Sequence, residues 1–147
     1  MADRNRGRDA DRSPAQLYAL VVGATLVVAG ILGFFYSSAF GSPGDVEAVL
    51  GILDVNGWHN IVHIASGALG LAMMGRRDSA RLYALGLGVV YTLVTILGFI
   101  VGNGGDILGF IPVNTEDNIL HLLIAVAGFG AYAASADTTR ARTASAT

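Results

Sequence analysis

Four apolar stretches divide this chain, and short polar segments separate them. They cover residues 17–36, 58–75, 82–102 and 118–136. A helix crosses a hydrocarbon core of about 30 Å with roughly 20 mostly apolar residues. Each stretch approaches that length, the second and fourth only if their first turns lie in the interface. The pattern therefore predicts four membrane-spanning helices in one membrane domain, residues 15–136.

The first and third stretches are copies of each other. Residues 17–34 read LYALVVGATLVVAGILGF and residues 82–99 read LYALGLGVVYTLVTILGF, with nine identical positions. The spacing Val-Asn-x-x-x-Asn-x-x-His follows each copy, ending at His63 and at His121. Such self-similarity indicates a duplicated unit. We predict two helical hairpins, residues 17–75 and 82–136, that enter the membrane in the same orientation as parallel repeats.

The basic residues lie on one side of the predicted membrane. All nine are arginines, and they occur before the first stretch, between the second and third, and after the fourth. The two remaining loops contain acidic residues and no basic ones. By the positive-inside rule, both termini and the middle loop are cytoplasmic. We therefore expect a multi-pass protein of the plasma (inner) membrane, with the lipid bilayer as its surroundings.

Composition narrows the class of protein further. The chain is 53% hydrophobic and 14% charged, with a mean hydropathy of +0.58, which is not the composition of a soluble domain. The arginines form no folded basic face, so we expect no nucleic-acid partner. The absence of cysteine excludes disulfides and thiol chemistry.

The segments outside the spans carry weaker patterns. Residues 1–14 and 137–147 are polar and aperiodic, and we expect disordered cytoplasmic tails. Residues 45–53 place apolar side chains at helical spacing, which predicts a short amphipathic helix on the outer surface. Asn56 and Asn114 precede helical runs and are expected to be N-caps, the second in a capping box with Asp117.

The three histidines of the chain lie at the outer ends of the second and fourth stretches. His59 and His63 are four residues apart and share one helix face with Asn60. Asn118 and His121 occupy the matching positions in the second copy, whereas Asp117 matches His59. If the two hairpins lie side by side, these residues gather at one depth. Polar groups at such positions are candidates for function because they are costly in a membrane unless paired.

Several interpretations of this polar group stay open. In the first, the imidazoles and the amides of Asn56, Asn60, Asn114 and Asn118 form structural polar pairs that fix the helix packing. In the second, His59, His63 and His121 bind zinc, iron or copper, with Asp117 or Glu116 as the fourth ligand. In the third, His63 and His121 are axial ligands of haem b. Proton relay or pH sensing is the fourth.

The paired motifs also carry a resemblance. VNGWHNIVHIASGALGL and IPVNTEDNILHLLIAVAG resemble segments of small four-span actinobacterial membrane proteins that form a domain-of-unknown-function family. The resemblance covers about residues 17–132. It implies the same four-span fold and brings no activity with it, since none is established for the family.

The sequence thus predicts an all-α integral membrane protein, a bundle of four transmembrane helices. The leading function is a non-enzymatic module that oligomerises or belongs to a larger membrane complex, because glycine and alanine in spans allow close helix packing. A metal- or haem-binding protein with an outward-facing histidine site is one alternative. A small interface enzyme acting on lipid or quinone is another, and no catalytic residue is assigned.

Overall fold

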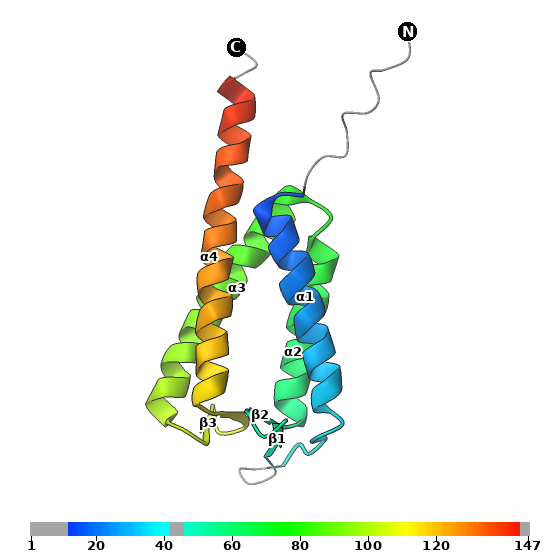
Figure 1. Ribbon diagram of the computed structural model, residues 1–147, viewed down its shortest axis with the longest axis vertical. Coiled ribbons are helices and arrows are strands. Elements are labelled where there is room, and N and C mark those ends of the chain that lie inside the picture. Colours follow the sequence, from blue (N-terminus) through cyan, green and yellow to red (C-terminus); the bar gives the residue numbers. More distant parts are fainter. Residues whose placement is uncertain (1–11, 42–45, 145–147) are drawn as a thin grey trace.

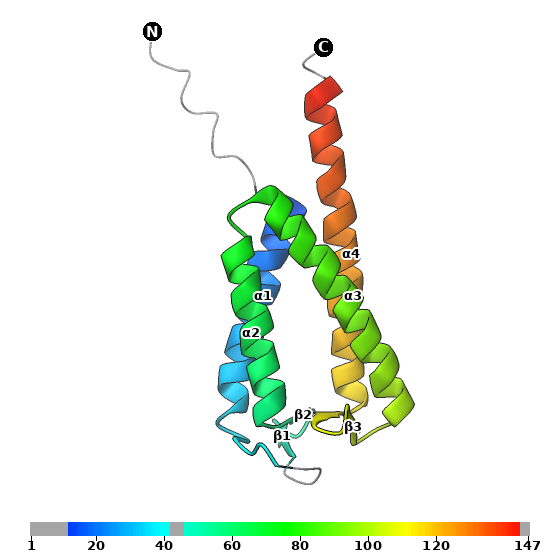
Figure 2. The same ribbon diagram turned by 180° about the vertical axis from the view of Figure 1, so that it is seen from behind.

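A computed structural model describes residues 12–41 and 46–144, in which four helices and two short hairpins are formed. The helices pack as two pairs, α1 on α2 and α3 on α4. The pairs meet at one end and diverge toward the end that carries the hairpins (Figure 1), as the view from behind also shows (Figure 2). The helices are α1 (Pro14–Gly33), α2 (Gly57–Met73), α3 (Arg77–Val101) and α4 (Thr115–Ala144). The strands are β1 (Glu47–Val49), β2 (Leu53–Val55), β3 (Gly105–Ile107) and β4 (Ile111–Val113).

Three helices of the described chain are long and apolar enough to cross a membrane. They are α1, α3 and the Thr115–Ala136 part of α4. Large apolar side chains such as Val28, Leu93 and Val126 are exposed on their outer surfaces, as expected where acyl chains replace water around a helix. These helices indicate a membrane protein. α2 has 17 residues, or about 25 Å of helix, and its crossing stays a prediction.

Local side-chain chemistry sets where the helices begin. Ser13 and Gln16 form a capping box at α1, and the Asn56 side chain accepts a hydrogen bond from the His59 backbone N–H at 2.9 Å. At α4, Asn114 Oδ1 accepts from the Asp117 N–H at 2.9 Å, while Asp117 Oδ2 accepts from the Asn114 N–H at 3.1 Å. Such bonds satisfy the amide donors that a first turn leaves free. The predicted caps at Asn56 and Asn114 are therefore confirmed.

The outer loops correct the all-α prediction, because they form antiparallel hairpins. β1 pairs with β2, and β3 pairs with β4, where a helix was expected over residues 45–53. The φ angles are 54° and 71° at Leu50 and Gly51, and 56° and 79° at Leu108 and Gly109. Two successive positive φ angles are those of a tight hairpin turn that matches strand twist. This turn chemistry overrides the helical spacing of the apolar side chains.

The C-terminal helix is longer than the predicted span. α4 continues to Ala144, whereas a tail was expected from residue 137. No glycine or proline follows Gly130, and alanine and arginine have high helix propensity, so the sequence offers no signal that ends the helix at 136. Residues 1–11 and 145–147 of the predicted tails, and Asp45, lie outside the described residues.

Matched tyrosines join the two helix pairs where these converge. The rings of Tyr18 and Tyr83 are 6.2 Å apart. The Tyr18 hydroxyl donates to the carbonyl oxygen of Ile124 on α4 at 2.9 Å, and the Tyr83 hydroxyl donates to that of Ser66 on α2 at 3.1 Å. Ile124 and Ser66 occupy matching positions in the two sequence copies. Each helix pair therefore donates one tyrosine hydrogen bond to the other pair, and both the donors and the acceptors occupy matching positions in the two copies.

Small residues allow the helices to approach closely within this chain. A Cβ atom added at Gly67 of α2 would meet the Gly23 carbonyl and Val27 of α1. A Cβ atom at Gly128 of α4 would meet the Ala84 carbonyl of α3. Gly67 in the second stretch and Gly128 in the fourth thus contact helices of the same protein.

Candidate metal centre

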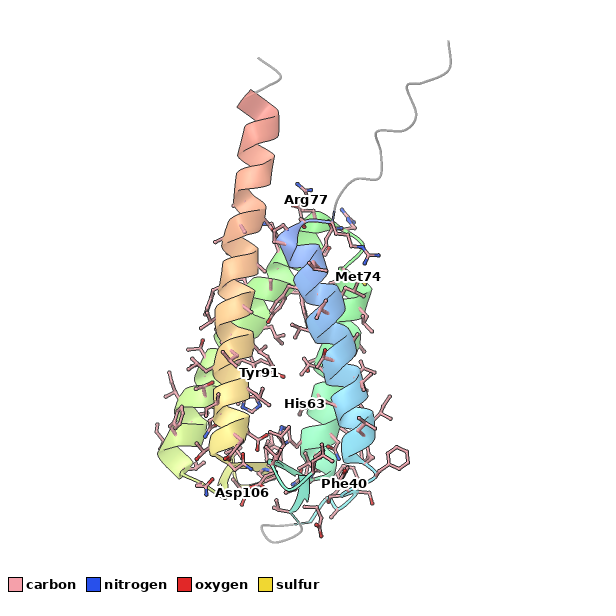
Figure 3. All side chains as sticks on the ribbon, in the orientation of Figure 1. Phe40, His63, Met74, Arg77, Tyr91 and Asp106 are labelled. Carbon is pink, nitrogen blue, oxygen red and sulfur yellow. The ribbon has the colours of Figure 1, made fainter. Side chains whose placement is uncertain are left out.

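The three histidines converge at the diverging end, next to the hairpins. One ring nitrogen from each of His59, His63 and His121 lies within 4.8 Å of the others, and the Nε2 atoms of His59 and His63 are 3.1 Å apart. Some point therefore lies within about 3 Å of all three nitrogens, compared with about 2.0–2.1 Å for a zinc–imidazole bond. A small closing movement would bring all three nitrogens onto one ion. Figure 3 shows His63 in the half of the molecule that carries the hairpins.

The hairpin formed by β1 and β2 orients the ring of His59. His59 is almost fully buried, and its Nδ1 lies 2.8 Å from the carbonyl oxygen of Asp54 in β2. A carbonyl oxygen can only accept, so Nδ1 carries the proton. The Nε2 atom of the neutral ring then presents its lone pair toward His63. This is the arrangement in which a second N–H fixes a metal-binding imidazole.

His121 is buried between the other two histidines and an aromatic ring of α3. Its ring centroid is 6.1 Å from that of His59 and 6.3 Å from that of His63. The ring of Tyr91 packs edge-on at 5.1 Å. Within the described part of the chain, Nδ1 of His121 has no hydrogen-bond partner. Burying a polar atom without a hydrogen-bond partner costs about 1–3 kcal/mol of folding free energy. A ligand that binds Nδ1 of His121 would therefore stabilise the protein.

Asp117, expected as a fourth ligand, is engaged by the backbone. Its Oδ2 accepts hydrogen bonds from the N–H of Asp54 at 3.0 Å and of Asn114 at 3.1 Å. The carboxylate therefore ties the β1–β2 hairpin to the start of α4. Glu116, the other carboxylate considered, is exposed to the surroundings.

The difference between His59 and Asp117 has a structural reason. In the matched hairpins, Asp54 corresponds to Pro112. Asp54 has an N–H that needs an acceptor across the hairpins, and Asp117 supplies it. Proline has no N–H, so the position that matches Asp117 in the other half does not have to accept a hydrogen bond from Pro112. That position is His59, which is thus available for other chemistry.

The capping asparagines also join the two hairpins. Asn56 Nδ2 donates to the carbonyl oxygen of Phe110 at 2.7 Å, and Asn114 Nδ2 donates to that of Ile52 at 2.6 Å. Phe110 and Ile52 match each other in the two copies. The two halves therefore exchange equivalent hydrogen bonds across the end that holds the histidines.

Asn60 and Asn118 fill space opened by glycine. The Asn60 side chain packs on Gly33 of α1 and donates to the carbonyl oxygen of Ser37 at 2.8 Å. The Asn118 side chain packs on Gly98 of α3 in the same way. Both asparagines are almost fully buried. Asn60 thus makes a polar contact with the Ser37 carbonyl, whereas Oδ1 of Asn118 has no hydrogen-bond partner among the described residues.

A cavity of about 80 Å³ lies beside the histidines, between α2 and α3. Tyr91 and Ser66 contribute to its wall together with aliphatic side chains, which are Val62, Leu87, Val90, Val94, Ile107 and Ile111. Tyr91 is a site residue that the sequence motifs did not indicate. A signal was present, because Tyr91 replaces the matching Leu26 in the first copy, and it lies in the same half of the molecule as His63 (Figure 3).

The fold and the site define a helical membrane protein that brings three histidines together beside a small cavity, with His59 and His121 buried and His63 half-buried. The chain matches, over residues 16–134, the family described as a domain of unknown function (DUF4383). It belongs to this family, which confirms the resemblance to an uncharacterised family that the paired motifs suggested. No match was found among curated proteins or among solved structures.

Proposed function

We propose that this membrane protein binds one transition-metal ion through His59, His63 and His121. The observation that carries the proposal is the convergence of three ring nitrogens within 4.8 Å of one another. Three protein ligands with a fourth position left for water or an external molecule are typical of reactive zinc centres. Imidazole also suits iron and copper, so the nitrogen donors favour these three metals.

Two details of the site support an ion over a purely structural histidine cluster. The Asp54 carbonyl fixes His59 with Nε2 facing inward, as a metal-ligand histidine requires. The buried Nδ1 of His121 lacks a partner among the described residues, although buried polar atoms are normally paired. Because the His59 proton is on Nδ1, the Nε2–H of His63 donates to His59 Nε2 at 3.1 Å. A bound ion would replace this hydrogen bond once the His63 proton moves to Nδ1.

A single ion fits this arrangement better than haem b. If His63 and His121 were axial ligands, the porphyrin would have to lie between their rings. His59 Nε2 is only 3.1 Å from His63 Nε2, and the His59 ring centroid is 6.1 Å from that of His121, so this ring would contact the porphyrin. The neighbouring cavity of about 80 Å³ is too small for the macrocycle.

The alternative functions gain no specific support. Glycine faces suggested a module that oligomerises or joins a larger complex, but Gly67 and Gly128 contact helices of the same chain. The oligomer, the complex and an enzyme acting on lipid or quinone stay predictions.

The proposal includes a four-span topology with cytoplasmic termini in the plasma membrane. Arg77 and Asp106 lie at opposite ends of the molecule (Figure 3), which agrees with an arginine-rich inner side and an acidic outer side. α2 would cross beside α1 with its ends in the interfaces, because modest thinning of the bilayer accommodates a short helix. The histidines then lie in the outer half of the membrane.

Metal content of the purified protein tests the proposal. After dialysis against zinc, we expect one ion per chain for the wild type and for Glu116→Gln, an exposed carboxylate beside the site. We expect His63→Ala to lose the ion while keeping its helical circular dichroism. A folded wild-type protein that binds no zinc, iron or copper contradicts the proposal.

A further inference from the structure

The cavity beside the histidines lies within the apolar part of the helices. Val62 is the sixth residue of α2, about 8 Å along the helix from its outer end, and Val94 is about 10 Å from the outer end of α3. At the hairpin end, the buried Ile107 of β3 forms part of the wall. The cavity is therefore covered by a hairpin on the side of the outer solution.

The exposed part of the wall belongs to the helix surfaces. Val62 of α2 and Val90 of α3 both line the cavity and are both exposed. On membrane-spanning helices, exposed apolar side chains contact acyl chains. The route into the cavity thus runs between α2 and α3 from the lipid.

Size and polarity restrict what the cavity can hold. Its volume of about 80 Å³ is roughly half that of a 150 Å³ cavity that holds benzene. An aromatic ring or a quinone head group is therefore too large, whereas a molecule of two heavy atoms fits. Apart from the histidines, Tyr91 and Ser66, the wall is aliphatic. It therefore disfavours an ion that the histidines do not hold, because moving a charge out of water is costly without a partner.

We infer that this cavity admits a small uncharged molecule, of the size of dioxygen or nitric oxide, from the bilayer to the histidine nitrogens. The inference deepens the proposed function and rests on it for two points: α2 crosses the membrane, so that the opening faces lipid, and the guest would meet the open fourth position of the metal. Entry of the guest depends only on the cavity and its opening toward lipid. It can therefore be measured on metal-free protein.

Dioxygen itself is the probe, because it is paramagnetic and partitions into bilayers. Leu87 lines the cavity and is 7% exposed, while Leu26 lies in the core away from it and is 3% exposed. In metal-free protein in lipid nanodiscs under oxygen pressure, we expect methyl relaxation at Leu87 to rise about threefold more than at Leu26, because Leu87 borders this cavity and Leu26 does not. Equal effects at the two leucines overturn the inference.

Two further arms test the route. A water-soluble gadolinium chelate is expected to leave the Leu87 methyl signals unchanged, and strong relaxation by the chelate would show entry from the solution instead. Val90→Phe should fill the mouth and reduce the oxygen effect at Leu87 to that at Leu26. The matched control is Val89→Phe, since Val89 is 46% exposed and Val90 is 52% exposed but Val89 is not part of the wall.

The outcomes separate this inference from the metal proposal. An unchanged oxygen effect in Val90→Phe overturns the route between α2 and α3, whatever the metal content. If Val90→Phe does not fold, the comparison of Leu87 with Leu26 in the wild type still decides whether oxygen enters. If oxygen enters the cavity but the purified protein binds no metal, the metal proposal is contradicted and the inference about the cavity stands.

Discussion

The side-chain amide of Asn56 donates a hydrogen bond to the carbonyl oxygen of Phe110 at 2.7 Å, and this bond joins the cap of α2 to the hairpin of the other half. Asn114 forms the matching bond to Ile52 at 2.6 Å. Each asparagine uses its oxygen as a helix cap and its nitrogen as a link between hairpins. The positions of the histidines therefore depend on these links, because the helix pairs diverge at this end.

Replacement of Asn56 should destabilise the protein more than loss of a helix cap alone. Asn56→Ala removes the cap and the bond to Phe110, so we expect a loss of about 2 kcal/mol in the free energy of unfolding. Asn103→Ala is the control, since Asn103 accepts hydrogen bonds from Thr115 at an exposed site. Thermal unfolding in detergent measures both variants, and equal losses would contradict the linking role of Asn56.

Two glycines of α3 should respond to alanine in opposite directions. A Cβ atom at Gly98 meets the Asn118 side chain, whereas one at Gly86 meets nothing within 4 Å. Gly98→Ala should therefore destabilise by about 1–3 kcal/mol through overpacking. Gly86→Ala should stabilise by about 0.5–1 kcal/mol, because glycine inside a helix is less favourable than alanine. The order of the two unfolding midpoints tests this, and a Gly98→Ala midpoint at or above that of Gly86→Ala refutes it.

Loss of the Tyr83 hydroxyl should weaken the contact between the helix pairs. Tyr83→Phe removes the bond to the Ser66 carbonyl and leaves the ring, so we expect a loss of about 1 kcal/mol. Tyr36→Phe, at an exposed position, should change the unfolding midpoint little. If the two variants unfold alike, the hydroxyl of Tyr83 does not stabilise the contact.

The absence of cysteine allows a direct test of the topology. Gly75→Cys lies at the exposed junction of α2 and α3, and Leu108→Cys lies at the exposed tip of the β3–β4 hairpin. A membrane-impermeant maleimide applied to intact cells should label only the second variant. After lysis both should react. Labelling of Gly75→Cys in intact cells would place the arginine-rich loop outside.

Much of the architecture could be predicted from the sequence because its physical causes are local. Apolar length identified the helices, and Asn56 and Asn114 identified two helix starts. The duplicated motif also predicted that His63 and His121 lie near each other, since matched positions on the two copies are expected at the same depth in the membrane. The repeat thus indicated a shared location for residues far apart in the chain.

The remaining features depend on backbone geometry and on contacts between the copies. Leu50 and Leu108 adopt positive φ angles. Leucine rarely adopts such angles, so these residues did not indicate hairpin turns and the hairpins were missed. The hydrogen bond between Asp117 and the N–H of Asp54 in β2 could not be predicted, because the sequence does not reveal how the two hairpins meet. Tyr91 could be recognised only once α3 was known to border the histidines.

The central claim is that His59, His63 and His121 together bind one metal ion, and X-ray absorption at the zinc edge of zinc-loaded protein tests it most directly. We predict three imidazole ligands and one further light atom at about 2.0–2.1 Å. His121→Ala, shown to be folded by circular dichroism, should lose one imidazole or the ion itself. A wild-type spectrum without imidazole scattering, or a spectrum unchanged in His121→Ala, would contradict the claim.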